Sequence, residues 1–384
     1  MVMLMDDTLV RKRGRKVHGT SWKRDPLGPH FHTNFVWGQR FLQLSAALPD
    51  RDCTGRARAV PVSFIHAPTA KKPKRNASPQ AWEEYHQKQN ETKISTIGIH
   101  ALHNIRRHLD TQWQGRTLIC AVDGGFTNRT VFRDIPDNTI LIGRIRKDAK
   151  LFAPPETDVV SRRGRPRWYG SALPTPESIR QDDSIPWQQV EAFAAGTRHI
   201  FDLKSIPAVR WSGTGNRTVQ VLIIRPLAYR PRKGSPLLYR DPAYLICTDP
   251  ALPLSRLLQA YLWRWEIELN FRDEKSLLGV GQAQVRTPAS VEKVPSLIVA
   301  AYAMLLLAGT SASDSSKILP KPKWQRSQPG ERCTTQQLIG LLRSQLWEKA
   351  LMMNLRHFAS ASRATRTPVN FANSLASAVC YAIK

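Results

Sequence analysis

The stretch YLWRWEIELNFRDEK, residues 261–275, constrains the fold most, because its charged residues repeat at helical spacing. The polar row consists of Tyr261, Arg264, Glu268 and Lys275. A helix advances by about 100° per residue, so spacings of three, four and seven place the row on one face. An apolar seam runs beside it through Leu258, Leu262, Trp265 and Leu269. The pattern predicts one long helix held by a buried seam, although a solvated face with (i, i+4) charge pairs is the alternative.

The charge balance indicates a polyanionic partner. The 384 residues include 57 Lys plus Arg and 30 Asp plus Glu, which gives a formal net charge of +27 and a pI near 10.5. Nucleic acid is the polyanion that such a balance favours. Five cysteines occur without a C-x-x-C pair, so neither a zinc site nor a disulfide framework is expected. This cysteine usage favours a reducing cytoplasm.

The sequence predicts no membrane association. The most apolar run, residues 294–309, is shorter than the roughly 20 residues that a membrane span requires, and a proline stands near its start. We therefore expect a buried core helix there. The first residues, MVMLMDDT, have no basic segment ahead of a long apolar stretch, so a secretory signal is not expected.

Apolar runs bounded by turn residues predict a sheet. Strand-like runs occupy residues 1–10, 33–48, 57–66, 117–122, 138–146 and 243–249. Residues 82–109 read as one long helix that Ser78-Pro79 begins. Residues 334–337 read as a cap that starts a further helix through Leu351, and residues 371–384 read as a small packed helix.

Acids stand at the ends of these elements. Asp6 and Asp7 are adjacent on the first strand, where neighbours point to opposite faces, so only one can face a shared site. Asp123 follows a buried strand, at the sheet edge where α/β folds place ligands. We expect Asp7, Asp123 and Glu268 together to hold divalent ions for phosphodiester cleavage. Asp249 is a further acid, although its place before a proline favours helix capping.

Basic loops could contact DNA. RKRGRK, residues 11–16, is either a solvated run or a phosphate contact. Arg162 and Arg165 belong to an Arg-Gly-Arg-Pro sequence of the kind that inserts into narrow minor grooves. An ordinary solvated or phosphate-facing loop is the alternative.

Three motifs together resemble a known family. They are DDT (residues 6–8), VDGGFTN (residues 122–128) and Y-x-x-R-x-x-x-E-x-x-x-x-x-x-K (residues 261–275). Their order is similar to that of the DDE transposases of bacterial insertion sequences, and more narrowly to the insertion-sequence-four family with its Tyr-Arg-Glu-Lys signature helix. The resemblance extends over about residues 1–308.

The resemblance implies an α/β fold with a ribonuclease-H-like (retroviral-integrase-like) core, in which helices flank a mixed five-stranded sheet. Residues 1–150 and 241–309 would form this core, residues 151–240 a β-rich insertion, and residues 310–384 a linker and C-terminal helices. Members usually carry an N-terminal helical DNA-binding region, whereas here six residues precede Asp7. On that basis we expect recognition of specific DNA ends to be weakened.

The resemblance also implies the site and the reaction. Asp7, Asp123 and Glu268 match the metal-binding triad, which would hold two Mg²⁺ ions, with Mn²⁺ as a substitute. Tyr261, Arg264 and Lys275 match the residues that grip phosphates of the transposon end. A tryptophan of the insertion, Trp168, Trp187 or Trp211, could receive a flipped base. The implied partner is double-stranded DNA, bound by a homodimer at paired mobile-element ends.

Three functions remain open from the sequence. The first is a transposase that cleaves DNA at mobile-element ends and joins them to target DNA. The second is a catalytically inactive, transposase-derived DNA-binding protein. The third is a ribonuclease-H-like nuclease that hydrolyses DNA without joining strands. The signature helix favours the first.

Overall fold

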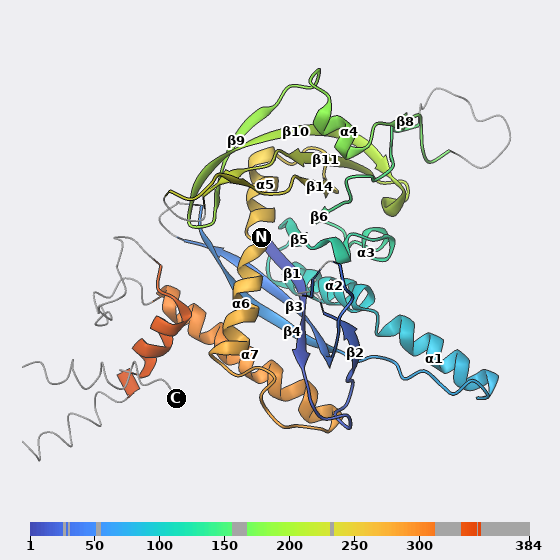
Figure 1. The fold of residues 1–384 in the computed structure, drawn as a ribbon, viewed down its shortest axis with the longest axis vertical. Coiled ribbons are helices and arrows are strands. Elements are labelled where there is room, and N and C mark those ends of the chain that lie inside the picture. Colours follow the sequence, from blue (N-terminus) through green and yellow to red (C-terminus); the bar gives the residue numbers. More distant parts are fainter. Residues whose placement is uncertain are drawn as a thin grey trace, which may run out of the picture.

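The computed structural model describes residues 1–25, 28–29, 31–50, 55–155, 167–230, 234–311, 332–343 and 345–346. The chain is a mixed α/β structure organised around one large mixed sheet of twelve strands (Figure 1). Helices cover both faces of the central strands. The expected α/β class is confirmed at this level.

The first half of the sheet comes from the N-terminal residues. Its strands are β1 (Val2–Arg11), β2 (Ser21–Arg24), β3 (Phe35–Pro49), β4 (Ala57–Ala67), β5 (Leu118–Val122) and β6 (Thr139–Arg144). The strands predicted in these regions are confirmed. β4, β3 and β1 pair antiparallel, whereas β1, β5 and β6 pair parallel. β2 pairs with the start of β3.

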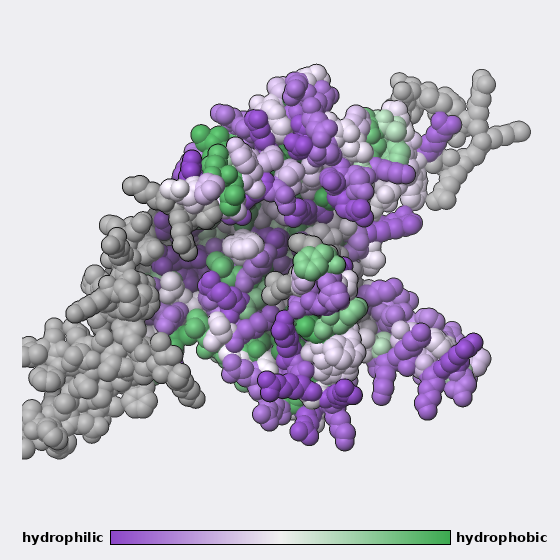
Figure 2. All heavy atoms as spheres, in the orientation of Figure 1, coloured by the Kyte–Doolittle hydropathy of each residue, from purple (hydrophilic) through white to green (hydrophobic). Residues whose placement is uncertain are grey.

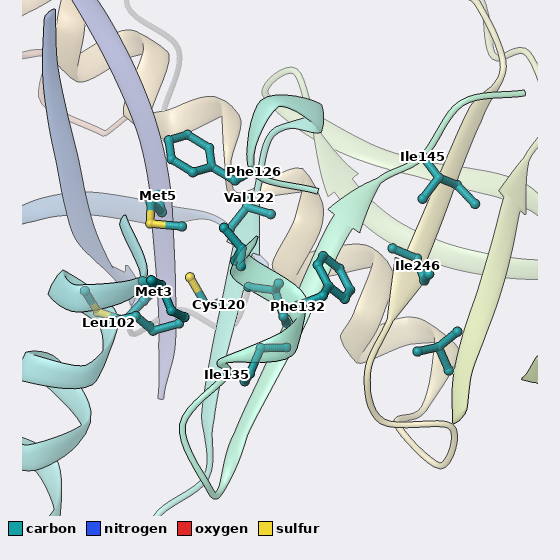
Figure 3. Packing of buried hydrophobic residues seen from close by; sticks show 14 of the residues in the cluster. Met3, Met5, Leu102, Cys120, Val122, Phe126, Phe132, Ile135, Ile145 and Ile246 are labelled. Carbon is teal, nitrogen blue, oxygen red and sulfur yellow. The ribbon is translucent and has the colours of Figure 1, made fainter. Parts of the chain in front are cut away.

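Both faces of β1 are buried, by different helices. Met3 and Met5 pack with Leu102 of α2 (Ile94–Gln112) and with Cys120 of β5 (Figure 3). Leu4, on the other face, packs with Ile267 of α6 (Trp265–Ser276). Odd-numbered residues of β1 therefore face α2 and even-numbered residues face α6.

The region expected as a β-rich insertion extends the same sheet. Its elements are β7 (Leu151–Phe152), β8 (Ala172–Leu173), α4 (Pro176–Gln181), β9 (Gln188–Ala194), β10 (Thr197–Trp211), β11 (Thr218–Ile224), β12 (Ala228–Tyr229) and β13 (Leu238–Tyr239). β14 (Ala243–Cys247), a predicted strand, lies between β6 and β11 and pairs antiparallel with both. β12 and β13 form a separate pair, and the other strands continue the main sheet.

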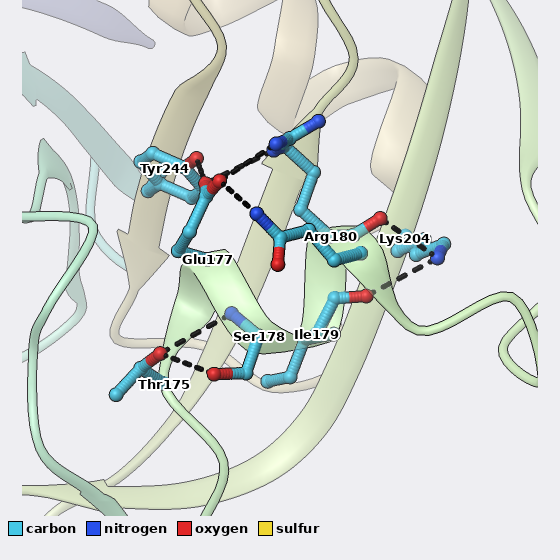
Figure 4. Close-up of polar contacts among 8 residues, drawn as sticks. Thr175, Glu177, Ser178, Ile179, Arg180, Lys204 and Tyr244 are labelled. Carbon is cyan, nitrogen blue, oxygen red and sulfur yellow. Dashed lines mark hydrogen bonds and ion pairs between the residues drawn. The ribbon is translucent and has the colours of Figure 1, made fainter.

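A buried lysine fixes α4 to this half of the sheet. Lys204 of β10 is 0% exposed and donates from Nζ to three main-chain carbonyls, those of Ile179, Arg180 and Asp182 (3.1, 3.1 and 2.6 Å). The Trp187 ring lies 4.4 Å from the same nitrogen. Glu177 of α4 meanwhile accepts a hydrogen bond from the hydroxyl of Tyr244 on β14 (Figure 4). Carbonyls at the end of a helix and an aromatic face therefore compensate the buried ammonium.

The long helix predicted around residues 261–275 is divided. α5 (Leu254–Leu262) ends at Trp263, and α6 begins at Trp265. Between them the amides of Arg264, Glu266 and Ile267 bond to carbonyls three residues back, which is a tightened turn. The indole nitrogen of Trp263 donates to the carbonyl of Gly55 (2.8 Å), which holds the turn against the chain that leads into β4.

The predicted apolar seam is confirmed at Leu258 and Leu262, which pack in one core cluster, and is wrong at Trp265. Trp265 is 58% exposed, and the buried positions of α6 are Ile267, Asn270, Phe271, Asp273 and Glu274. Its buried polar groups find distant partners: Asn270 donates to the carbonyl of Ala59, and Thr335 donates to Asp273. Partners far along the chain make these polar positions buried, which a periodicity of apolar residues cannot reveal.

The apolar run at 294–309 lies within α7 (Pro288–Ser311), which is only half a core helix. Val299, Tyr302 and Leu306 are buried beside β4, whereas Leu297 and Met304 are 71% and 68% exposed. The prediction of a buried core helix is therefore confirmed for one face of α7 and wrong for the other. By length and composition alone, α7 is one helix among the described residues that could cross a membrane, and its inner face packs as a core helix does.

The other local predictions are confirmed in some places and changed in others. The helix predicted at 82–109 is two helices, α1 (Pro79–Glu91) and α2, with Ser78 capping the first as expected. Asp249 accepts from the amide of Ala251 in a turn, while Pro253 precedes the first residue of α5. Thr334 and Gln337 form the predicted cap of a helical segment that begins at residue 335. Leu351 and residues 371–384 lie outside the described residues.

Glu274 is an acid buried between α6 and the sheet. It is 1% exposed, and its Oε1 has no hydrogen-bond partner. Burial raises the pKa of Glu274 to about 8, while a side-chain hydrogen bond with Gln43 of β3 opposes this rise. The carboxyl is therefore neutral at pH 7 in the folded chain and ionised in the unfolded chain, where its pKa is near 4.5.

We expect Glu274→Gln to flatten the pH dependence of stability. Because the folded pKa is the higher one, the wild-type free energy of unfolding should fall as pH rises from about 4.5 to 8. One pKa unit corresponds to about 1.4 kcal/mol, so the variant should be the more stable chain at pH 9 by a few kcal/mol. Urea unfolding at pH 5, 7 and 9 measures this, with exposed Glu84→Gln as the control. Parallel pH curves for wild type and Glu274→Gln would contradict the assignment.

Candidate active site

The site is built where β1 and β5 run parallel beneath the junction of α5 and α6. Met5 is the register partner of Val122, so Asp6 and Asp123 follow at the same point of two adjacent strands. Arg264 leaves the tightened turn above them, and Glu268 lies one turn further along α6. Hydrophilic side chains cover most of the face that carries α5 and α6 (Figure 2).

Arg264 connects two of these acids. Its Nη1 donates to Oδ2 of Asp6 (2.7 Å), and its Nη2 donates to Oε1 of Glu268 (2.9 Å). The side chains of Arg264 and Asp6 are 13% and 14% exposed. Such shielded, hydrogen-bonded ion pairs are screened far less than surface pairs.

The acids influence one another through space. Burial raises the pKa of Asp6 to about 7, with Arg264 opposing the rise and the Asp123 carboxylate adding to it. Burial works against the charge of Arg264, but Asp6, Glu268 and Asp123 together hold its pKa above the ordinary value. The site therefore carries more negative charge than its single bridging guanidinium neutralises.

The other residues of the signature helix lie along the same row. Burial raises the pKa of Tyr261, whose ring lies 5.8 Å from the Arg264 guanidinium. Nζ of Lys275 donates to Oγ1 of Thr8 on β1 (2.6 Å), and burial lowers its pKa. Arg264 and Lys275 both reach β1 and Arg264 also reaches Glu268, as the predicted shared face requires, whereas Tyr261 lies on α5 before the tightened turn.

Asp7 lies on the opposite face of β1. Both of its carboxylate oxygens accept from Arg40 of β3, at 2.6 and 2.8 Å. The structure therefore does not bring Asp7 together with Asp123 and Glu268 and places Asp6 there instead. Strand alternation is the reason, because Asp6 shares its face with Leu4 and Thr8.

The loop after Asp123 is held firmly. Gly124–Phe126 forms a 3₁₀ turn, and Asn128 caps α3 (Arg129–Arg133) by accepting from two main-chain amides. The Asn128 side chain also donates to Ser95 at the start of α2 (2.9 Å). A Cβ at Gly143 would lie 2.2 Å from Oγ1 of Thr127, so glycine on β6 is what lets this loop approach.

The remaining sequence candidates fall elsewhere. Arg162 and Arg165 lie outside the described residues. Trp211 packs against Phe132 in the core, and Trp187 lies between Lys204 and Arg225. Trp168 lies beside Arg133, 5.9 Å from its guanidinium.

Metal ligation requires side chains to move. Among the residues that the structure describes, no three His, Cys, Asp or Glu side chains are close enough to hold a metal ion. The donor chemistry nevertheless fits a hard divalent cation, because Arg264 bridges the carboxylates of Asp6 and Glu268, and the nearby Asp123 carboxylate adds to the raised pKa of Asp6, which is about 7.

Comparisons with solved structures find matches, whereas comparisons with family profiles and curated proteins find none. Among solved structures, the chain is similar to one described as a cryo-EM structure of piggyBac transposase synaptic complex with hairpin DNA, with a TM-score of 0.35 and 11% sequence identity. The alignment covers 98% of this chain and 57% of that chain, so this chain spans just over half the length of its neighbour.

We expect Arg264→Met to destabilise the folded chain. Removing the guanidinium leaves Asp6 and Glu268 without their shared cation, which should lower the free energy of unfolding by about 3–5 kcal/mol. Adding Asp6→Asn to that variant should restore part of the loss, because one uncompensated charge disappears. Urea unfolding at pH 8 in metal-free buffer measures both effects.

Arg146→Met is the matched control, because Arg146 forms an exposed pair with Asp148. Its effect should stay within about 0.5 kcal/mol. If Arg146→Met and Arg264→Met lower the free energy of unfolding equally, the buried bridge contributes no more to stability than an exposed ion pair.

Proposed function

We propose that the chain is a DNA transposase that cleaves phosphodiester bonds with divalent metal ions and transfers the resulting strand end to target DNA. The convergence of Asp6, Asp123 and Glu268 around Arg264 is the observation that carries this proposal. A cluster of acids in a chain with a net charge of +27 is suited to ions that contact a polyanion.

The sheet supports a ribonuclease-H-like core. Its antiparallel strands β4, β3 and β1 are followed by the parallel strands β5 and β6, and Asp6 and Asp123 occupy adjacent strands at its centre. The narrower assignment to the insertion-sequence-four family rests on the signature helix. That assignment remains a proposal.

Asp6 takes the place that the sequence resemblance gave to Asp7. Asp6, Asp123 and Glu268 would hold two Mg²⁺ ions, for which Mn²⁺ could substitute. When bound, these ions supply an activated water or hydroxyl and offset charge on the leaving oxygen. Glu268 would have to leave Arg264 to serve as a ligand, since the guanidinium bridges it to Asp6.

The cationic row would position the DNA strand. Once a metal engages the acids, Arg264 can turn its charge toward a phosphate, and Lys275 can exchange Thr8 for a phosphate oxygen. Tyr261 can donate its hydroxyl proton to a phosphate oxygen. The Arg162 and Arg165 loop would contact DNA outside this site, and two chains would act on paired ends in the cytoplasm.

Cleavage assays on three variants test the assignment. DNA carrying the native flanking ends is incubated with Mg²⁺ or Mn²⁺ and with wild type, Glu268→Gln, Asp6→Asn or Asp7→Asn. We expect Glu268→Gln and Asp6→Asn to lose more than about 100-fold in rate, because even outer-shell changes cost 10–100-fold at metal sites. The cleavage rate of Asp7→Asn should stay within a few-fold of the wild-type rate, because Asp7 lies on the other face of β1.

A reversed result, with Asp7→Asn inactive and Asp6→Asn active, would return the role to Asp7. A strand-transfer assay with pre-cleaved ends separates a transposase from a nuclease, which gives no joined product. If the wild type binds DNA but never cleaves it, the chain is instead a transposase-derived DNA-binding protein.

A further inference from the structure

A basic pocket lies on the face of β1 and β3 opposite α6. Its volume is about 290 Å³, and its walls come from β2, β3, the end of β4, α1 and the start of α2. Its polar and charged lining consists of Lys23, Arg40, Thr69, Tyr85, Gln89, Thr92, Lys93 and Ser95. Three cations thus line one cavity, and no acid is among the described residues of its wall.

The pocket has a surplus of positive charge. Arg40 is engaged by Asp7, but Lys23 and Lys93 contact only neutral groups in the hydrogen bonds of the structure: Thr69 and Asn90, respectively. Burial lowers the pKa of Lys23 and the nearby Arg40 lowers it further, whereas the Asp7 carboxylate, which pairs with Arg40, raises it. A bound anion would relieve this repulsion between cations.

The start of α2, which carries Lys93, adds a favourable dipole. α2 has 19 residues, and its N-cap residue, Lys93, makes no side-chain capping hydrogen bond. Ile94 and Ser95 of its first turn line the pocket. The amide groups of a helix start favour an anion, and here they add to the charges of three side chains.

The pocket borders the candidate active site. Arg40 holds Asp7, the neighbour of Asp6, while Ser95 is hydrogen-bonded to Asn128 in the loop that follows Asp123. Each DNA strand carries a phosphate about every 3.4 Å along the helix axis. A strand with one phosphate at Asp6 and Asp123 therefore carries further phosphates on both sides of the one that reacts.

We infer that this pocket binds a backbone phosphate of the DNA strand beside the one that reacts. Lys23 and Lys93 pair with its oxygens, and the hydroxyls of Thr69, Thr92 and Tyr85 surround it. The inference rests on the proposed function and adds to it a DNA contact outside the signature helix. The site fixes the register of the strand without reading its sequence.

Salt-dependent DNA binding tests the pocket. The variant Lys23→Gln/Lys93→Gln is compared with Lys150→Gln/Lys293→Gln, which removes two exposed lysines from elsewhere and leaves the same net charge. Affinity for a fluorescent duplex is measured from 50 to 200 mM salt. The pocket variant should bind several-fold more weakly, with a log–log salt slope smaller by about 1, whereas the control should keep the wild-type slope.

Equal slopes for the two variants would overturn the inference. A failure of the proposed function gives a different result. If the wild type binds DNA without cleaving it, the proposed enzymatic activity is refuted, but the binding test of the pocket stays valid. If the wild type cleaves DNA and the pocket variant keeps the full salt slope, only the inference about the pocket is refuted. If the wild type does not bind DNA, both the proposed function and the inference about the pocket are refuted.

A footprint on the wild-type chain needs no substitution. DNA should protect Lys23 and Lys93 from acetylation, as detected by mass spectrometry, and should leave Lys150 and Lys293 reactive. Inorganic phosphate at millimolar concentration serves as the second probe. Protection by phosphate with none by DNA would show a site for the free ion and would overturn the DNA contact.

Discussion

The salt bridges of Arg264 hold the candidate site together. One guanidinium reaches across from the helix pair to Asp6 on the central strand and also binds Glu268 on its own helix. Asp6 and Glu268, which lie more than 260 positions apart in the sequence, are thereby joined beside Asp123. Without that cation, their mutual repulsion would favour separation of α6 from β1, so the bridge joins fold and site.

The two faces of β1 divide the chemistry. Asp6 and Thr8 meet Arg264 and Lys275 on the α6 side, while Asp7 meets Arg40 on the α2 side. Neighbouring acids in one sequence motif thus serve different surroundings. Each face also has its own cation, which explains how two adjacent acids fit in the centre of a sheet.

The sequence predicted the strands well and the faces poorly. Continuous apolar runs identify β5 and β14 because both faces of those strands are covered. The same property conceals orientation: Met3, Leu4 and Met5 are all apolar, so nothing local shows which of Asp6 and Asp7 faces α6. Arg40 and Gln43 come from β3, and such tertiary partners leave no signal in the spacing of a single strand.

In the signature helix, too, the sequence predicted some contacts and not others. Its polar row was predictable because helical spacing alone places Arg264 and Lys275 on one face. Its buried side was not, because Asp273 and Glu274 are buried by contacts with residues elsewhere in the chain. A charged residue of α6 therefore has one of two roles, contact with solvent and ligand or contact with the core, and the sheet beneath the helix decides between them. The tightened turn at Trp263 sets the angle at which Arg264 meets that sheet, so a local departure from regular helix is what aligns the cation with Asp6.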